Sequence, residues 1–211
     1  SSRLGASLAG NAGARAIMCR SSPLPVAAAE GGSTCIFGVI RHAERADGPF
    51  ATLGGKRWTQ TEDAQRWPRD PPLSDAGIEE ARSIANDVSR FSSSSGSEVH
   101  VVIASPYLRC LQTAAAICKA LGPRVQLLVD HSLGEVYGPL TMGLTQPHAA
   151  VRTLADVPGP ELRALLAQAE VHGTWPAWPE DLRAAKHRYT GRFLQCIHWA
   201  NQMRKNVLVV T

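Results

Sequence analysis

Residues 99–122, VHVVIASPYLRCLQTAAAICKALG, are the stretch that decides the fold. The first six residues are mostly apolar and β-branched, and they predict a buried strand. Ser105 and Pro106 then look like an N-cap followed by a proline at the first helical position, while Gly122-Pro123 predicts where the helix ends. The buried positions of this helix are predicted to be Leu108, Leu111, Ala115 and Cys118. A strand that passes directly into a helix is the building unit of a parallel α/β sheet.

Further strands and helices alternate on both sides of this stretch. Three more strands are expected at 35–40 (CIFGVI), 125–129 (VQLLV) and 206–210 (NVLVV), and two more helices at 75–91 and 180–205. The serine-rich segment 92–97 is expected to be a flexible linker that ends the first of these two helices. The apolar stripe of the last helix is predicted at Leu182, Ala185, Tyr189, Phe193, Cys196, Ala200 and Met203. This alternation predicts a three-layer α/β/α fold with a mostly parallel central sheet.

The chain divides into one domain and a leading segment. Its 211 residues suffice for one sizeable α/β domain, expected at 35–211. Residues 1–34 are rich in Ser, Ala, Gly and Arg and contain no acidic residue before Glu30. That composition resembles an organelle transit segment, and a disordered tail explains it equally well. Residues 138–179 hold many Gly, Pro and Trp, with one helical stretch near 161–171, and are expected to be an insertion that caps the sheet edge.

The overall composition narrows the classes of function. The formal net charge is +4, from 22 Lys and Arg against 18 Asp and Glu. This mild excess suits anionic ligands, but it is not clustered enough to predict nucleic-acid binding. No apolar run is long enough to span a bilayer. The five cysteines are odd in number and form no CxxC pair, which favours a reducing compartment. The expected location is therefore the cytoplasm, or an organelle if residues 1–34 are a transit segment.

Charged residues follow the predicted strands at the points where ligands bind in parallel sheets. The residues expected to meet at this edge of the sheet are Arg41, His42, Arg45, Arg109 and Glu135. Guanidinium groups bind phosphate oxygens in a bidentate way and stay charged at ordinary pH. A neutral imidazole is a competent nucleophile at pH 7, and a carboxyl group whose pKa is raised can protonate a leaving oxygen. The set therefore suits a phosphate monoester.

Four motifs carry a resemblance to a known family. Residues 39–45 (VIRHAER) resemble the signature of the histidine phosphatase superfamily, also called phosphoglycerate mutase-like, and 105–113 (SPYLRCLQT) resemble its second motif. Residues 72–77 (PLSDAG) match its proline-leucine-serine-x-x-glycine segment, and 135–138 (EVYG) are similar to the segment that carries its proton donor. The resemblance spans 36–211. With Arg45 and the segment 70–73 (DPPL), it points most to the eukaryotic branch of ubiquitin-associated and SH3-domain-containing (STS) phosphatases.

This resemblance implies a role for each site residue. His42 is expected to be the nucleophile that accepts the phosphate, Glu135 the proton donor, and Arg41, Arg45 and Arg109 the phosphate ligands. No metal or cofactor is expected. The family also has a second histidine directly after its last core strand, which would follow Thr211. We therefore expect a chain ending at Thr211 to be weakly active or inactive.

Several alternatives remain open from the sequence. A mutase would return the phosphate to its substrate, but mutases of the superfamily lack the Glu44-Arg45 pair, which favours hydrolysis. A phosphate-binding pseudoenzyme is the third hypothesis. Arg45 could instead be a surface residue paired with Asp47 or Glu44, and Glu135 could simply be solvated. The partner is expected to be a phosphorylated small molecule or phosphoprotein; its identity and the oligomeric state are not readable.

Overall fold

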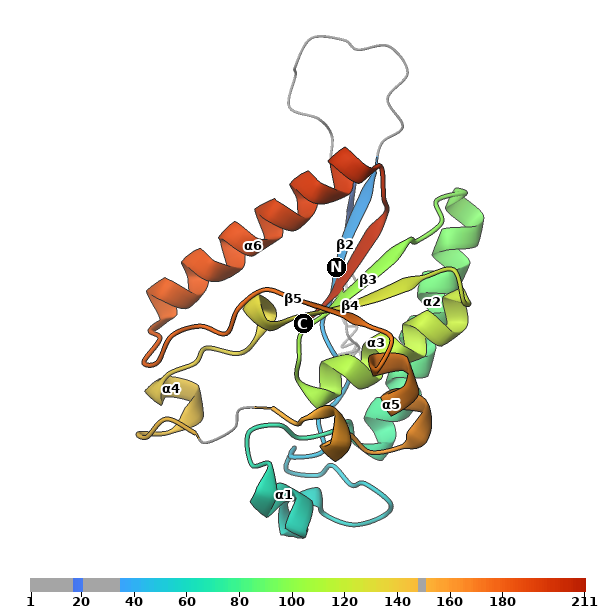
Figure 1. Ribbon diagram of the computed structural model, residues 1–211. Helices are drawn as coiled ribbons and strands as arrows, with labels where there is room; N and C mark the ends of the chain where they lie inside the picture. The colour runs from blue at the N-terminus through green and yellow to red at the C-terminus, as the bar shows by residue number, and fades with distance from the viewer. Residues whose placement is uncertain (1–16, 21–34, 148–150) are drawn as a thin grey trace, which may run out of the picture.

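A six-stranded sheet forms the centre of the molecule, in the order β1-β2-β6-β3-β4-β5 (Figure 1). The computed structural model describes residues 17–20, 35–147 and 151–211. The strands are β1 (Ile17–Arg20), β2 (Ile36–Ile40), β3 (Val101–Ala104), β4 (Gln126–Asp130), β5 (Glu170–His172) and β6 (Val207–Val210). The pairs from β2 to β5 are parallel, and β1 joins β2 antiparallel. The predicted mostly parallel α/β fold is confirmed.

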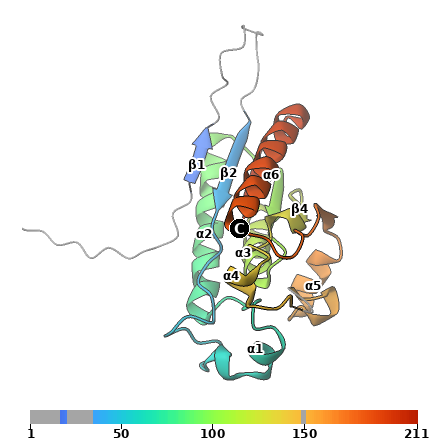
Figure 2. The ribbon, with the colours of Figure 1, turned by 90° about the vertical axis from the view of Figure 1, so that its left-hand side faces the viewer.

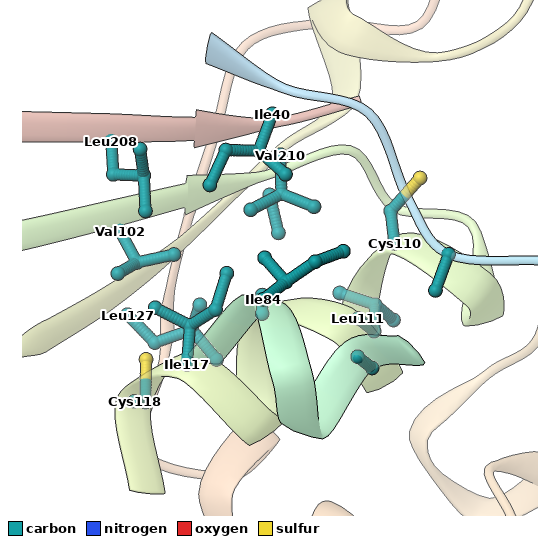
Figure 3. Packing of buried hydrophobic residues seen from close by; sticks show 14 of the residues in the cluster. Ile40, Ile84, Val102, Cys110, Leu111, Ile117, Cys118, Leu127, Leu208 and Val210 are labelled. Carbon is teal, nitrogen blue, oxygen red and sulfur yellow. The ribbon is translucent and has the colours of Figure 1, made fainter. Parts of the chain in front are cut away.

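Helices cover both faces of this sheet. Helices α2 (Asp75–Ser95) and α3 (Leu108–Leu121) lie on one face and α6 (Leu182–Met203) on the other. The shorter helices are α1 (Glu62–Arg66), α4 (Pro139–Met142) and α5 (Pro160–Leu166). Successive side chains of a strand point to opposite faces. Leu208 and Val210 of β6 accordingly face α2 and α3, where Ile84 and Ile117 pack on them (Figure 3), whereas Val207 and Val209 belong to the cluster under α6.

The serine run at the end of α2 is helical, so the prediction of a flexible linker at 92–97 is wrong. The helix continues through Ser95 and ends at Gly96, whose left-handed backbone (φ 62°) suits a residue without a Cβ. Ser93 and Ser95 donate their hydroxyls to the carbonyls of Ser89 and Phe91, one turn earlier. These local bonds let serines sit within a helix that their propensity disfavours.

The start of α3 also differs from the prediction. Ser105 and Pro106 precede the helix, which begins at Leu108 after an extended Tyr107 that gives no side-chain cap. The cap comes from far away in the sequence: the backbone N–H of Leu108 donates to Asp70 Oδ1 at 2.7 Å. A distant carboxylate cannot be recognised from the local pattern at 105–108, so the sequence misplaced the cap.

The region 138–179 and helix α6 correct two further expectations. Residues 170–172 form β5, the edge strand itself, so this part of the region extends the sheet, and the helix near 161–171 is shorter than predicted, ending at Leu166. On α6, Ala185, Cys196 and Ala200 are buried as predicted, but Leu182 and Met203 are 62% and 55% exposed. The apolar stripe therefore covers only the middle of the helix.

The leading segment contributes one strand to the described fold. Residues 17–20 form β1 at the edge of the sheet beside β2 (Figure 2). No strand was predicted here, because the segment was expected to be disordered or a targeting sequence. The rest of 1–34 lies outside the described residues. Among the residues that the structure describes, no helix is both long and apolar enough to cross a membrane.

Candidate active site

Three adjacent strands end together and place the predicted site residues side by side. The backbone N–H of Thr211 donates to Ile40 O (3.0 Å), that of His42 to Thr211 O (2.8 Å), and that of Ser105 to Val210 O (2.9 Å). A pocket of about 660 Å³ opens at this point. Its lining includes all five predicted residues, Arg41, His42, Arg45, Arg109 and Glu135, together with Ser105, Tyr107, Leu133, Tyr189, Phe193 and Thr211.

His42 is held in one ring orientation and kept neutral. Its Nδ1 lies 2.7 Å from the carbonyl oxygen of Ala43, a contact in which a protonated Nδ1 donates and the other ring nitrogen keeps its lone pair. Burial lowers the pKa of His42 to about 4, and the nearby charges of Arg109, Arg41 and Arg45 act in the same direction against the Ala43 bond. The unprotonated ring is the form that can act as a nucleophile.

Arg109 presents unpaired donors inside the pocket. Its side chain is only 5% exposed, yet Nε and Nη1 have no hydrogen-bond partner among the described residues. The guanidinium lies over the ring of Tyr107, with Cζ 4.6 Å from the ring centroid, and Nη2 is 3.4 Å from Glu135 Oε2. Buried guanidinium nitrogens without partners are costly. They are therefore well placed to donate hydrogen bonds to the oxygens of a bound anion.

Arg41 and Arg45 line the same pocket from the segment after β2. Arg45 also donates from Nε to Asp47 Oδ1 at 2.9 Å, with Nη2 on the second oxygen of that carboxylate. The surface pairing with Asp47 that the sequence left open therefore exists, and it coexists with a position at the pocket rim, since the Arg45 side chain is 39% exposed.

The second motif ties the segment that carries His42 to helix α3. The buried hydroxyl of Thr113 accepts from the Ala43 N–H at 3.2 Å and donates to Arg109 O at 2.9 Å. Gln112 accepts from the N–H of Leu73 at 2.8 Å. The family resemblance includes this glutamine-threonine pair but implies no role for it. The structure shows that the pair joins three segments behind the pocket.

The proline-leucine-serine segment packs against the loop that follows His42. Ser74 caps α2 by accepting from the Gly77 N–H and donates to Glu44 Oε2 at 2.9 Å. A Cβ at Gly77 would lie 2.1 Å from the carbonyl oxygen of Glu44. Only glycine leaves room for this approach, so the motif fixes the loop rather than touching the pocket.

Asp70 anchors the start of α3 next to Arg109. Besides the Leu108 bond, its Oδ2 lies 3.6 Å from Nε of the buried Arg152, which also binds Asp63 with two nitrogens at 2.6 and 2.7 Å. Burial raises the pKa of Asp70 to about 6, against the Leu108 hydrogen bond and the charges of Arg152 and Arg109. No local pattern singles out Arg152, because its partners lie more than 80 residues away in the chain.

Glu135 lies across the pocket from His42, in the loop that follows β4. Its side chain is 39% exposed, and Oε2 faces Arg109 at 3.4 Å. The loop packs on Trp175, which stacks on His131 at 5.1 Å and meets Tyr107 edge-on. On the other side it is bound by Arg188 and Tyr189 of α6, two residues whose contact with this loop the sequence analysis missed.

Two other features of the molecule bear on where a ligand binds. A larger groove of about 850 Å³ lies between α2, α3 and α5, lined mostly by apolar side chains such as Ile78, Ala116 and Leu165. It lacks the histidine and the three arginines that converge in the smaller pocket. In the described part of the chain, no three His, Cys, Asp or Glu side chains are grouped to hold a metal ion.

Comparison with known proteins establishes the fold and then the family. The crystal structure of the ecdysone phosphate phosphatase, EPPase, from Bombix mori in complex with tungstate is similar, with a TM-score of 0.60 and 20% sequence identity. The match covers 82% of this chain and 71% of that chain. Residues 39–211 match the histidine phosphatase superfamily (branch 1). The chain therefore belongs to the histidine phosphatase superfamily. No curated protein sequence matches it.

Proposed function

We propose that the protein is a phosphomonoester hydrolase that works through a phosphohistidine at His42 and needs no metal. The observation that carries the proposal is the pocket itself. A neutral imidazole and three arginines share it, and one of these arginines is buried with two unpaired nitrogens. A phosphate dianion would supply the missing hydrogen-bond partners and offset the positive charges. Family membership supports the same conclusion.

In the first chemical step, the free ring nitrogen of His42 attacks phosphorus. The N–P bond forms as the P–O bond to the leaving group breaks, and Glu135 gives its proton to the departing oxygen. Arg41, Arg45 and Arg109 hold the three non-bridging oxygens, where charge is concentrated in the transition state. Glu135 lines the same pocket, and a positioned carboxyl group can act as the general acid.

In the second step, water attacks the phosphohistidine. The ionised Glu135 takes a proton from the water as the new P–O bond forms, the N–P bond breaks, and His42 returns to its neutral form. Inorganic phosphate leaves with Glu135 protonated for the next cycle. Each group is thereby restored.

The substrate class is a phosphate monoester. The silkworm protein is named for its action on ecdysone phosphate; we carry over only the ester class. Placement in the STS branch, a second histidine directly after Thr211, weak activity of a chain without it, and a cytoplasmic location all stay predictions.

Trapping the intermediate tests this function. The full-length natural protein is incubated with a phosphate ester labelled with ³²P, quenched in base, and mapped. We expect one acid-labile, base-stable adduct at His42. The adduct and the turnover should both be lost in His42→Ala and both be kept in His187→Ala, which changes an exposed histidine of α6. A protein that shows neither adduct nor turnover is the pseudoenzyme of the third hypothesis.

The mutase alternative has its own measurement. With a phosphoglycerate as substrate, a hydrolase releases inorganic phosphate, whereas a mutase returns the label to a different oxygen of the same acid. Release of free phosphate at the rate of substrate loss supports hydrolysis. Isomerised phosphoglycerate without free phosphate would overturn it.

A further inference from the structure

One guanidinium on α6 holds most of the loop that carries Glu135. Arg188 donates from Nη1 to the carbonyl oxygens of Ser132 (2.6 Å) and Gly134 (3.0 Å), and from Nη2 to that of Glu135 itself (3.3 Å). The side chain thus reaches three carbonyls within four residues of the loop. No other arginine in the described part of the chain has such a set of partners.

A buried carboxylate fixes this guanidinium in place. Glu180 accepts from Arg188 Nε and Nη2, both at 2.7 Å, and its side chain is only 5% exposed. Although burial opposes it, the hydrogen bonds from Arg188 and from the Tyr137 N–H hold the pKa of Glu180 below its ordinary value. Glu180 therefore stays ionised, and the pair is a fixed ion pair rather than a mobile surface contact.

The same pair grips the far end of the loop. The N–H of Tyr137 donates to Glu180 Oε2 at 2.9 Å, and the N–H of Glu180 donates back to Tyr137 O at 2.8 Å. A Cβ on Gly138 would lie 2.0 Å from the carbonyl oxygen of Glu180. The loop is thus fixed on both sides of Glu135, while the Glu135 carboxylate remains free to face the pocket.

A buried ion pair of this kind is a weak source of stability, because desolvating two charges offsets most of their attraction. It is well suited to fixing geometry, since the planar guanidinium directs its donors along set directions. The hydrogen bonds of Arg188 go to the backbone around Glu135 and to Glu180, and its guanidinium also lies over the Tyr189 ring, with Cζ 4.7 Å from the ring centroid. Its geometric effect is therefore concentrated on the proton donor.

We propose that Arg188, held by Glu180, is a positioning residue that places the Glu135 carboxyl group for proton transfer to the leaving oxygen. The inference rests on the proposed hydrolase and refines it. Without the guanidinium, the carbonyls of Ser132, Gly134 and Glu135 lose the donor that they share, and Gly134 keeps only its bond from the Tyr189 hydroxyl. The carboxyl group then departs from the position it holds opposite Arg109. Arg188 itself touches neither substrate nor reacting atoms.

The dependence of rate on the leaving group tests this role. An alkyl phosphate needs proton donation to its leaving oxygen, whereas p-nitrophenyl phosphate has a stable leaving anion and needs it far less. We expect Arg188→Met to lower the ratio of kcat/KM for the alkyl ester to that for the aryl ester on the order of 10²-fold. Glu135→Gln should lower the same ratio at least as much.

Two further variants complete the design. Arg183→Met removes an exposed arginine from the same helix and should leave the ratio unchanged. Arg188→Lys keeps one cationic donor for Glu180 but cannot reach three carbonyls at once, so it should lower the ratio by an intermediate factor. This variant keeps the test decisive if Arg188→Met fails to fold.

The outcomes separate the two proposals. If the Arg188 variants lose activity equally on both esters, the role of Arg188 is a general structural one and the inference is overturned. Unchanged activity on both esters would overturn it as well. If Glu135→Gln also leaves the ratio unchanged, the assignment of Glu135 as the acid fails, and the inference fails with it. If the native protein forms no adduct at His42, that result instead contradicts the proposed hydrolase itself.

Discussion

The carboxylate of Asp70 caps helix α3 across 38 residues of sequence, through a 2.7 Å hydrogen bond from the backbone N–H of Leu108. The next residue of that helix is Arg109, whose guanidinium lies in the pocket. The position of Arg109 in the pocket is thus determined in part by a loop that does not itself line the pocket.

Removing this cap should destabilise the protein. Asp70→Ala loses an N-cap and leaves the buried Arg152 with one carboxylate instead of two, so we expect the free energy of unfolding to fall by about 2–4 kcal/mol. Asp70→Asn keeps an acceptor for Leu108 and should lose about half as much. Urea unfolding measures both. Asp87→Ala, which breaks only an exposed ion pair with Arg90, should change stability by less than about 0.5 kcal/mol.

The lowered pKa of His42 predicts acid sensitivity. The ring titrates near 6.5 when unfolded and near 4 when folded, so the unfolded chain binds more protons in between and stability falls as pH drops through that window. His42→Gln removes this proton uptake. Between pH 7 and 4.5, the native protein should therefore lose roughly 2 kcal/mol more stability than the variant. Parallel pH slopes for the two proteins would mean that His42 titrates normally.

Substitution by alanine is predicted to have opposite effects on stability at Gly77 and at Gly191. A Cβ at Gly77 would meet the Glu44 carbonyl at 2.1 Å, so Gly77→Ala should cost about 3 kcal/mol and displace the His42 loop. Nothing lies within 4 Å of a Cβ at Gly191, inside α6, so Gly191→Ala should stabilise the protein by about 0.5–1 kcal/mol. Thermal unfolding of the two variants checks both signs.

The hydroxyl of Thr113 links the segment that carries His42 to the first turn of α3. Thr113→Val leaves the buried Ala43 N–H without an acceptor, a loss of about 1–3 kcal/mol. We expect kcat/KM to fall, because the segment that carries His42 is no longer fixed to α3. Thr113→Ser keeps the hydroxyl and should restore most of the activity. If valine and serine behave alike, packing rather than the hydrogen bond explains the threonine.

Much of the fold follows from local pattern. The strand at 101–104, the helix after it, and the parallel order of strands and helices all rest on periodicity and turn residues within short windows. The motifs around His42 and Arg109 identified the family, and parallel strands brought the two residues together as expected.

What the sequence missed are contacts made across long separations. Arg152, Glu180 and Arg188 sit in segments without recognisable motifs. The two arginines are largely buried against a carboxylate or backbone carbonyls of a distant loop, and the buried Glu180 accepts from the N–H of Tyr137, 43 residues away. Asp70 was noticed only as part of a family resemblance, and its capping role depends on a helix 38 residues away. Such partners are set by the folded topology, so no window of sequence contains the signal.

The central position of β6 has a consequence for how the protein is made. This strand comes last in the described chain, yet it lies between β2 and β3, with Val39 and Ile103 both opposite Val209. Until it is synthesised, the strands bearing His42 and the start of the Arg109 helix have no shared partner, and their edges are unpaired. Contacts this distant along the chain slow folding and leave nascent edges open to aggregation. A cell producing this protein thus depends most on chaperone protection during the interval before β6 emerges.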